Sequence, residues 1–361
     1  MPDATTKTLS LYDATREDIA TLFSSQPKYR VDQIWQALYT QLKSVNDIST
    51  LSGALREQLS AAFPTALTLQ TEQNNAAGDT VKFLWTLRNG GHPIETVLML
   101  YQDRATVCVS TQAGCAMGCG FCATGQAGFS RHLTAGEIVE QAIRAAQRAT
   151  KLGRRVSNIV FMGMGEPLAN EGPVRLAVEK LHDDVGISAR HLTVSTVGIV
   201  PGIKALTKWP LPVNLAVSLH AGRDELRDEL VPINKRYPLA MLMNACVDYL
   251  KVKNRRVTFE WALIDKVNDT DQDAEELAAL CKQLTPSAHV NLIPLNPTPG
   301  WPTRGSSGNH VRQFASWLED LGVNATVRQN RGTDIDAACG QLAAGQAITP
   351  VTLGRREDTS D

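Results

Sequence analysis

The chain has 361 residues, of which 43% are hydrophobic and 20% are charged, and its formal net charge is −1 at pH 7. A globular chain of this length buries a sizeable core, as one large domain with an appendage or as two domains of ordinary size. The balanced charge excludes a globally basic surface, so any nucleic acid has to be bound by local patches.

Residues 1–70 are predicted to form a helical accessory domain. The first residues lack the layout of a signal peptide, and no run is long and apolar enough to span a membrane, so we expect a cytoplasmic protein without a membrane partner. Amphipathic spacing at 16–25, 29–42 and 52–63 indicates helices. Basic and aromatic side chains at the start of the second helix either bind RNA or form its solvated face.

Residues 71–104 carry the signals of strands and a turn. Apolar and polar residues alternate on both sides of the sequence RNGG at 88–91, as they do in a β-hairpin. We interpret this segment as a hairpin that links the helical domain to the rest of the chain.

Residues 105–345 repeat a pattern of strand followed by helix. Apolar runs with strand character begin near residues 105, 157, 191, 213, 256, 289 and 325, and helical patterns lie between them, as at 134–149, 238–251, 272–284 and 310–321. Such alternation implies parallel strands joined by right-handed crossovers. The prediction is an α/β fold with a partial (β/α)6-type barrel as its core, followed by a tail at 346–361.

In such a barrel, ligand-binding residues lie at the C-terminal ends of the strands. The candidates at these positions are Gly165 and Glu166, Ser195, Ser218, Leu219, His220 and Asn296. Their hydroxyl, imidazole and amide groups can hold a ribose or an adenine, and the Glu166 carboxylate can accept from the ammonium group of an amino acid. Taken singly, each can equally be a helix cap or a loop hydrogen bond.

Four of the seven cysteines lie within residues 108–122. The odd total and this crowding are typical of reduced thiols that bind metal or react. Cys115, Cys119 and Cys122 form C-x3-C-x2-C on a loop with glycines, and three thiolates suit an iron–sulfur cluster with one open iron. The alternatives are a zinc site with His132 as fourth ligand and a redox C-x-x-C pair.

Cys339 has a different context from the buried cysteines expected in helices. It lies in RGTDIDAACGQLA, which is too polar and too rich in small residues for a core helix. This segment predicts a loop that presents a nucleophile.

The cysteine loop, with Phe121 before its last cysteine, resembles the signature of the radical S-adenosylmethionine (SAM) superfamily. The resemblance implies that Cys115, Cys119 and Cys122 hold a [4Fe-4S] cluster whose open iron binds SAM. Further segments resemble the RlmN group of RNA methyltransferases within that superfamily. They are RATVCVSTQAGCAMGCGFCATGQAGF, FMGMGEPLAN, STVGIVPGI, VSLHA, RDELVPINKRYPL, HVNLIPLNPTPG and RGTDIDAACGQLA.

The RlmN resemblance implies methylation of carbon 2 of an adenine in 23S ribosomal RNA (rRNA) and in transfer RNA (tRNA). It assigns to Cys339 the transfer of a methyl group from one SAM, activated by a radical from a second SAM. It assigns to Cys108 the release of the RNA through a disulfide with Cys339. Glu95 becomes the candidate acceptor of the ring proton, whereas the sequence alone favours a solvated glutamate on a strand.

Two rival functions remain at this point. The sister group that methylates carbon 8 of the same adenine shares the cluster and both reactive cysteines, and Pro167 after Glu166 favours the carbon-2 group. A zinc-binding RNA adaptor is the second rival. We expect a monomer and an electron donor such as flavodoxin. Candidate RNA contacts, each of which can equally be a solvated charge, are Lys28, Arg30, Arg131, His132, Arg255, Arg256 and Arg331.

Overall fold

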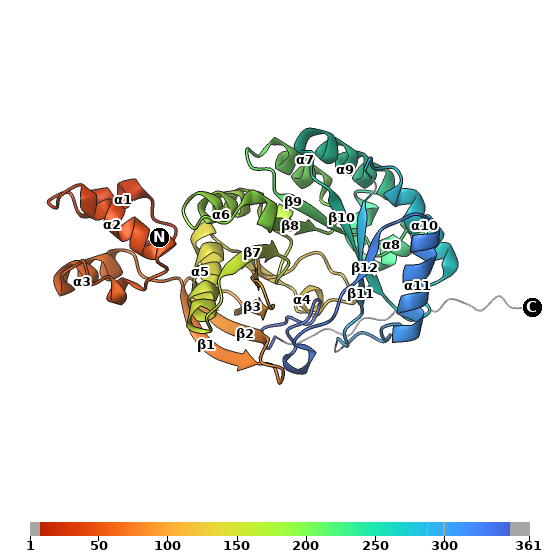
Figure 1. Cartoon of the computed structure of the whole chain (residues 1–361), viewed down its shortest axis with the longest axis horizontal. Coiled ribbons are helices and arrows are strands. Elements are labelled where there is room, and N and C mark those ends of the chain that lie inside the picture. The colour runs from red at the N-terminus through yellow and green to blue at the C-terminus, as the bar shows by residue number, and fades with distance from the viewer. Residues whose placement is uncertain (1–7, 287, 299, 347–361) are drawn as a thin grey trace, which may run out of the picture.

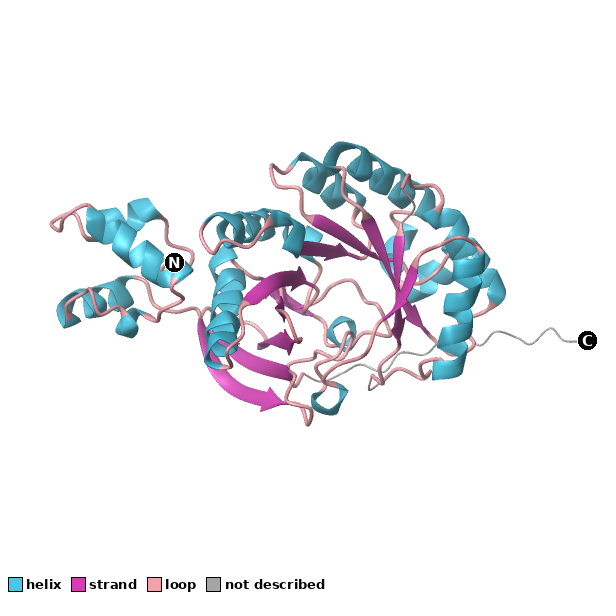
Figure 2. Cartoon of the chain, viewed as in Figure 1, coloured by secondary structure: helices cyan, strands magenta, loops and turns pink. Residues whose placement is uncertain are grey.

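The computed structural model describes residues 8–286, 288–298 and 300–346, and one curved ten-stranded sheet organises them (Figure 1). Helices cover the outer side of this sheet (Figure 2). In spatial order, the strands are β1 (Leu67–Asn74), β2 (Thr80–Leu87), β3 (Ile94–Leu100), β4 (Ala105–Cys108), β7 (Val156–Phe161), β8 (Leu192–Thr196), β9 (Asn214–Ser218), β10 (Val257–Leu263), β11 (His289–Pro294) and β12 (Ala325–Val327). The predicted tail lies, from residue 347 on, outside the described residues.

Within the ten-stranded sheet, the seven strands β4, β7, β8, β9, β10, β11 and β12 are mutually parallel, which confirms the predicted fold class. All seven apolar runs of the sequence form strands. The helices around them are α5 (Ala135–Lys151), α6 (Glu171–Asp183), α7 (Val200–Lys208), α8 (Asp224–Leu230), α9 (Leu239–Lys253), α10 (Asp271–Cys281) and α11 (Gly308–Asp320). Within the described residues, no helix is both long and apolar enough to cross a membrane.

The hairpin of β2 and β3 is present, and it extends the main sheet. β1 pairs with β2, and β3 pairs with β4, all antiparallel. β1 starts at Leu67, inside the range that the sequence indicated as helical. Because β1 is an edge strand in which only Leu67 is buried, its sequence carries little apolar alternation.

A short sheet and a short helix frame the cysteine loop. Strands β5 (Gln112–Gly114) and β6 (Phe129–His132) pair antiparallel on its two sides. The four-residue helix α4 (Ala123–Gln126) begins directly after Cys122. The loop is therefore held at both ends by regular structure.

The N-terminal helices α1 (Arg16–Leu22), α2 (Tyr29–Trp35) and α3 (Gly53–Ala62) dock on α5 and α6 through polar contacts. Asp13 accepts hydrogen bonds from Thr134 Oγ1 (2.8 Å) and from the Gly136 amide (2.6 Å) at the start of α5. Lys180 of α6 donates to the Tyr12 carbonyl (2.7 Å). Such partly buried charged contacts fix the position of one part against the other.

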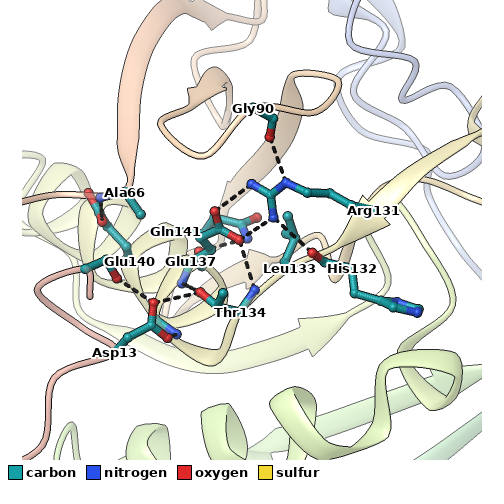
Figure 3. A network of polar contacts seen from close by, with 12 residues as sticks. Asp13, Ala66, Gly90, Arg131, His132, Leu133, Thr134, Glu137, Glu140 and Gln141 are labelled. Carbon is teal, nitrogen blue, oxygen red and sulfur yellow. Dashed lines mark hydrogen bonds and ion pairs between the residues drawn. The ribbon is translucent and has the colours of Figure 1, made fainter. Parts of the chain in front are cut away.

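The start of α5 also engages one candidate RNA contact (Figure 3). Arg131 forms two hydrogen bonds to the carboxylate of Glu137, which is fully buried, and a third to the carbonyl of Gly90. Its guanidinium therefore joins β6, α5 and the hairpin turn. The interpretation of Arg131 as a solvated charge is wrong.

The Gly136→Ala substitution should weaken the docking of the N-terminal helices on α5. A Cβ at residue 136 would lie 2.5 Å from Asp13 Cγ, so the N-terminal helices have to move. Overpacking of this kind costs about 1–3 kcal/mol, which thermal unfolding would show as a lower Tm. Gly172→Ala in α6 is the matched control, because its Cβ meets nothing within 4 Å. Equal Tm values for the two variants would contradict the docking role of residue 136.

Candidate functional site

Two adjoining pockets open at the C-terminal ends of the parallel strands. Pocket A has a volume of about 1020 Å³, including space open to solvent, and Cys115, Cys119 and Cys122 line it together. Pocket B, of about 1240 Å³ by the same measure, has Cys108 in its lining. Cys339 lines both pockets. The fold thus brings together five cysteines from distant parts of the sequence.

The three cysteines of pocket A lie in an apolar surround. Cys119 packs with Phe121, Leu226 and Leu230 in a small buried cluster. Burial raises the pKa of Cys115 to about 12, and it also raises the pKa of Cys119 well above the usual value. As free thiols, Cys115 and Cys119 stay protonated at neutral pH, so a bound metal is what would make these two residues thiolates.

This donor set fits an iron–sulfur cluster. Three soft sulfur ligands, the kind that iron–sulfur clusters select, line one pocket, and apolar side chains pack around Cys119. Among the described residues, no three His, Cys, Asp or Glu side chains converge to hold a single metal ion. A [4Fe-4S] cluster does not need three side chains that converge on one point, because each cysteine binds a different iron. His132, the candidate zinc ligand, has its Nδ1 3.0 Å from Gln112 Nε2.

The glycines of FMGMGEP are required by the packing of the chain itself. A Cβ at Gly165, which has φ of 101°, would lie 2.5 Å from Gln112 Cβ. The carboxylate of Glu166 is buried and accepts from the amides of Leu168 (2.9 Å) and Val197 (2.8 Å). Burial raises its pKa to about 7 although both amides oppose the shift. Because a carboxylate has about four acceptor positions, Glu166 can still bind an ammonium group in pocket A.

Three of the candidate SAM-binding residues, Ser195, Ser218 and His220, line pocket A. His220 has a positive φ of 61°, and its Nδ1 accepts from the Ala262 amide (3.0 Å). Burial lowers the pKa of His220 to about 3, so the ring is neutral and its remaining proton is on Nε2. Its ring packs edge-on against Phe121, with centroids 4.8 Å apart.

Two other candidates do not line either pocket. The side chain of Leu219 is fully buried in the core, and its carbonyl accepts from Arg227 Nε (3.0 Å). Glu95 is 4% exposed, which contradicts the interpretation as a solvated glutamate. It forms an ion pair with Lys82 (3.0 Å), which no feature of the sequence had indicated.

The backbone around Cys339 is tied to the cysteine loop of pocket A. The Ala123 amide donates to the Gly340 carbonyl (2.7 Å), and Thr124 Oγ1 donates to the Leu342 carbonyl (2.5 Å). Asn296, a candidate cofactor ligand, donates its Nδ2 to the Cys339 carbonyl (3.0 Å) while lining pocket A. The segment 339–342 is therefore hydrogen-bonded to the residues that directly follow Cys122.

A second set of contacts holds the same segment to the hairpin. Glu95 Oε2 accepts from the amides of Ala343 (3.0 Å) and Ala344 (3.1 Å). Lys82 Nζ, already paired with Glu95, also lies 3.4 Å from the Asp336 carbonyl. We call this group of contacts the Lys82–Glu95 latch. It fixes the segment on both sides of Cys339, whose side chain remains exposed.

Pocket B carries one functional group that the sequence interpretation missed. Arg328, directly after β12, lines both pockets and lies 3.5 Å from Glu260. The nearby Cys339 sulfur is the main cause that raises the pKa of Arg328. Its position at a strand end was the available signal. Cys108, by contrast, is buried, and this burial raises its pKa to about 12.

Comparisons with known proteins identify the family of this chain. The family profile described as the radical SAM superfamily matches residues 109–281. Curated relatives named "Probable dual-specificity RNA methyltransferase RlmN" include one from Chloroflexus aurantiacus (47% identical, 94% of this chain and 93% of the relative) and one from Rhodococcus opacus (47%, 94% and 95%).

A solved structure is similar over nearly the whole chain. The radical SAM methyltransferase from Sphaerobacter thermophilus matches with a TM-score of 0.89 and 48% identity, over 93% of this chain and 99% of that one. Identity of this level over most of the length shows common membership rather than a shared fold alone. The chain belongs to the RlmN family of radical SAM-dependent RNA methyltransferases.

Proposed function

We propose that the protein methylates carbon 2 of an adenine in 23S rRNA and in tRNA. The observation that carries this proposal is the position of Cys339, which lines both the pocket with the three cysteines and the pocket with Cys108. The Cys339 sulfur can thus receive a methyl group in pocket A and contact the substrate adenine in pocket B. The family resemblance supports the remaining details: a cytoplasmic monomer, and a donor such as flavodoxin.

Each pocket has a separate task in this proposal. Cys115, Cys119 and Cys122 would hold the [4Fe-4S] cluster, and Glu166, Ser195 and Ser218 would contact SAM beside it. When bound, these groups supply the methyl group and the 5′-deoxyadenosyl radical. The SAM-contacting role of His220 would use its neutral Nε2–H as a donor.

The two reactive cysteines act in sequence in pocket B. Cys339 carries the methyl group. Removal of a hydrogen atom from it leaves a carbon radical that adds to adenine, and the adduct then loses the ring proton and one electron, for which the oxidised cluster would be the acceptor, so protein and RNA are linked. The Cys108 thiolate then attacks the Cys339 sulfur. A disulfide forms, the sulfur–carbon bond breaks, and its electron pair goes to the carbon, which takes up a proton to become the methyl group.

Two protons move in these steps. We assign the ring proton of adenine to Glu95 as acceptor: Cys108 pairs with Val97, and Glu95 lies two residues before Val97 on the same face of β3. Glu95 is thus a diagonal neighbour of Cys108 across the two strands, about 7–8 Å away. Cys108 is protonated beforehand, since burial raises its pKa to about 12, and its proton would go to the carbon that leaves the Cys339 sulfur.

The product identifies the reaction. After anaerobic reconstitution with iron and sulfide, the protein should be brown, contain about four irons, and convert rRNA fragments and tRNA to 2-methyladenosine with SAM and a reductant. Chromatography with mass detection against both isomer standards distinguishes the carbon-2 from the carbon-8 product. Only 8-methyladenosine would assign the sister activity, and a colourless protein with one bound zinc would refute the enzyme.

Cys339→Ala and Cys108→Ala should fail at different steps. The first variant should bind iron normally and lose methyl transfer by several orders of magnitude, because no sulfur carries the methyl group. The second should accumulate protein bonded to RNA, visible as a mass increase on denaturing gels. Free methylated RNA from Cys108→Ala at the parent rate would contradict its role in release.

Lys82→Met should release the segment that holds Cys339. The substitution leaves the Glu95 carboxylate buried and unpaired, and breaking a buried pair in this way costs about 3–5 kcal/mol. We expect faster alkylation of Cys339 by iodoacetamide, measured by peptide mass mapping, and slower methyl transfer. The buried Cys246 reports on global unfolding in the same experiment, and it should stay protected.

Lys282→Met on the surface is the matched control for Lys82→Met, since Lys282 is exposed just beyond α10. It removes the same charge without a buried partner. An alkylation rate of Cys339 that is equal in both variants would show that the Lys82–Glu95 latch does not hold the segment.

A further inference from the structure

One buried arginine lies beneath pocket A without a role in the functions assigned so far. Arg227 belongs to the RDELVPIN segment and is fully buried in α8. Its guanidinium donates to the carbonyls of Val197 (2.6 Å), Ser218 (3.2 Å) and Leu219 (3.0 Å). These carbonyls are at the C-terminal ends of β8 and β9, where pocket A opens.

Within the part of the chain that the structure describes, all the acceptors of Arg227 are uncharged. Besides the three carbonyls, it bonds to Asn234 Oδ1 (2.7 Å). The carboxylates of Asp224 (2.9 Å) and Asp228 (2.7 Å) accept from Asn234 Nδ2 instead, so they reach the guanidinium only through that amide. A buried charge without a bonded counter-ion costs several kcal/mol, and such an arrangement persists where another negative group offsets it.

We expect the negative charge that offsets the Arg227 guanidinium to lie toward the three cysteines of pocket A. Leu226 and Leu230, which flank Arg227 in α8, pack in the same apolar cluster as Cys119 and Phe121. Burial lowers the pKa of Arg227 to about 10, which still leaves it charged at neutral pH, and a Cys119 thiolate is the main charge that opposes the shift. A [4Fe-4S] cluster with three thiolates is anionic, and its negative charge grows by one on reduction.

We propose that Arg227 is the buried counter-ion of the iron–sulfur cluster and raises the reduction potential of that cluster. The proposal rests on the proposed cluster site. A fixed positive charge in a dry surround favours the more negative, reduced state, and cluster potentials respond to net charge and to burial. Arg227 would thereby ease the electron transfer that starts each radical step, without contact with SAM or RNA.

The midpoint potential of the cluster tests this role, because a purely structural contribution of Arg227 would not change it. Reconstituted parent, Arg227→Gln and Arg227→Lys proteins are titrated anaerobically while the reduced cluster is followed by electron paramagnetic resonance. Arg227→Gln should have a more negative midpoint, whereas Arg227→Lys, which keeps the charge, should stay near the parent. Equal midpoints for parent and Arg227→Gln at full iron content would overturn the proposal.

A second variant keeps Arg227 in place, in case Arg227→Gln does not fold. Asp228→Asn removes a charge that offsets the guanidinium through Asn234, so its midpoint should shift in the positive direction. The control is Glu225→Gln, an exposed change of equal charge on the same helix, which should shift it less. A midpoint for Asp228→Asn that does not exceed the control's would also overturn the proposal.

Iron uptake by the parent separates this inference from the proposed function. A parent chain that takes up no iron refutes the cluster, and with it both proposals. A parent that is loaded and active, with coincident midpoints in all variants, refutes the counter-ion alone.

Discussion

The arrangement of the two pockets depends on backbone hydrogen bonds to the segment around Cys339. Its carbonyls at residues 339, 340 and 342 accept from Asn296, Ala123 and Thr124, which belong to two other parts of the chain. One of the acceptors, Gly340, has a φ of 84°, a left-handed backbone that favours glycine, so the glycine of AACG allows this course of the chain. The composition that suggested a loop is thus what allows the loop to be fixed.

This anchoring couples the two pockets. Ala123 and Thr124 directly follow Cys122, so a displacement of the cysteine loop also displaces the carbonyls of Gly340 and Leu342, which come directly after Cys339. The hydrogen bonds are mostly between neutral groups, each worth about 1 kcal/mol, so the segment is held by several weak contacts rather than one strong one. Such a segment can be ordered in one step of a reaction and released in another.

The sequence predicted those parts of the fold and site that depend on local patterns. The parallel strands have continuous apolar runs, and C-x3-C-x2-C is a spacing, so both are visible in one stretch of chain. The contacts of Glu95 and Asn296 could not be predicted in this way, because their hydrogen-bond partners at residues 339–344 lie far away in sequence. The burial of Arg227 and the position of Arg328 between the pockets were not predicted from the sequence, because a charged residue is most often solvated.

Glu95 shows how proton transfer and release of the segment can be one event. As a carboxylate it accepts from two amides of the Cys339 segment and pairs with Lys82. If Glu95 accepts the ring proton of adenine, as proposed, it loses its charge, and both the ion pair and the charge-assisted hydrogen bonds weaken together. The segment would then loosen after the proton has left the adenine ring, when the Cys339 sulfur must bond to Cys108 and the RNA must leave. The order of the chemical steps would therefore follow from the contacts of one buried carboxylate.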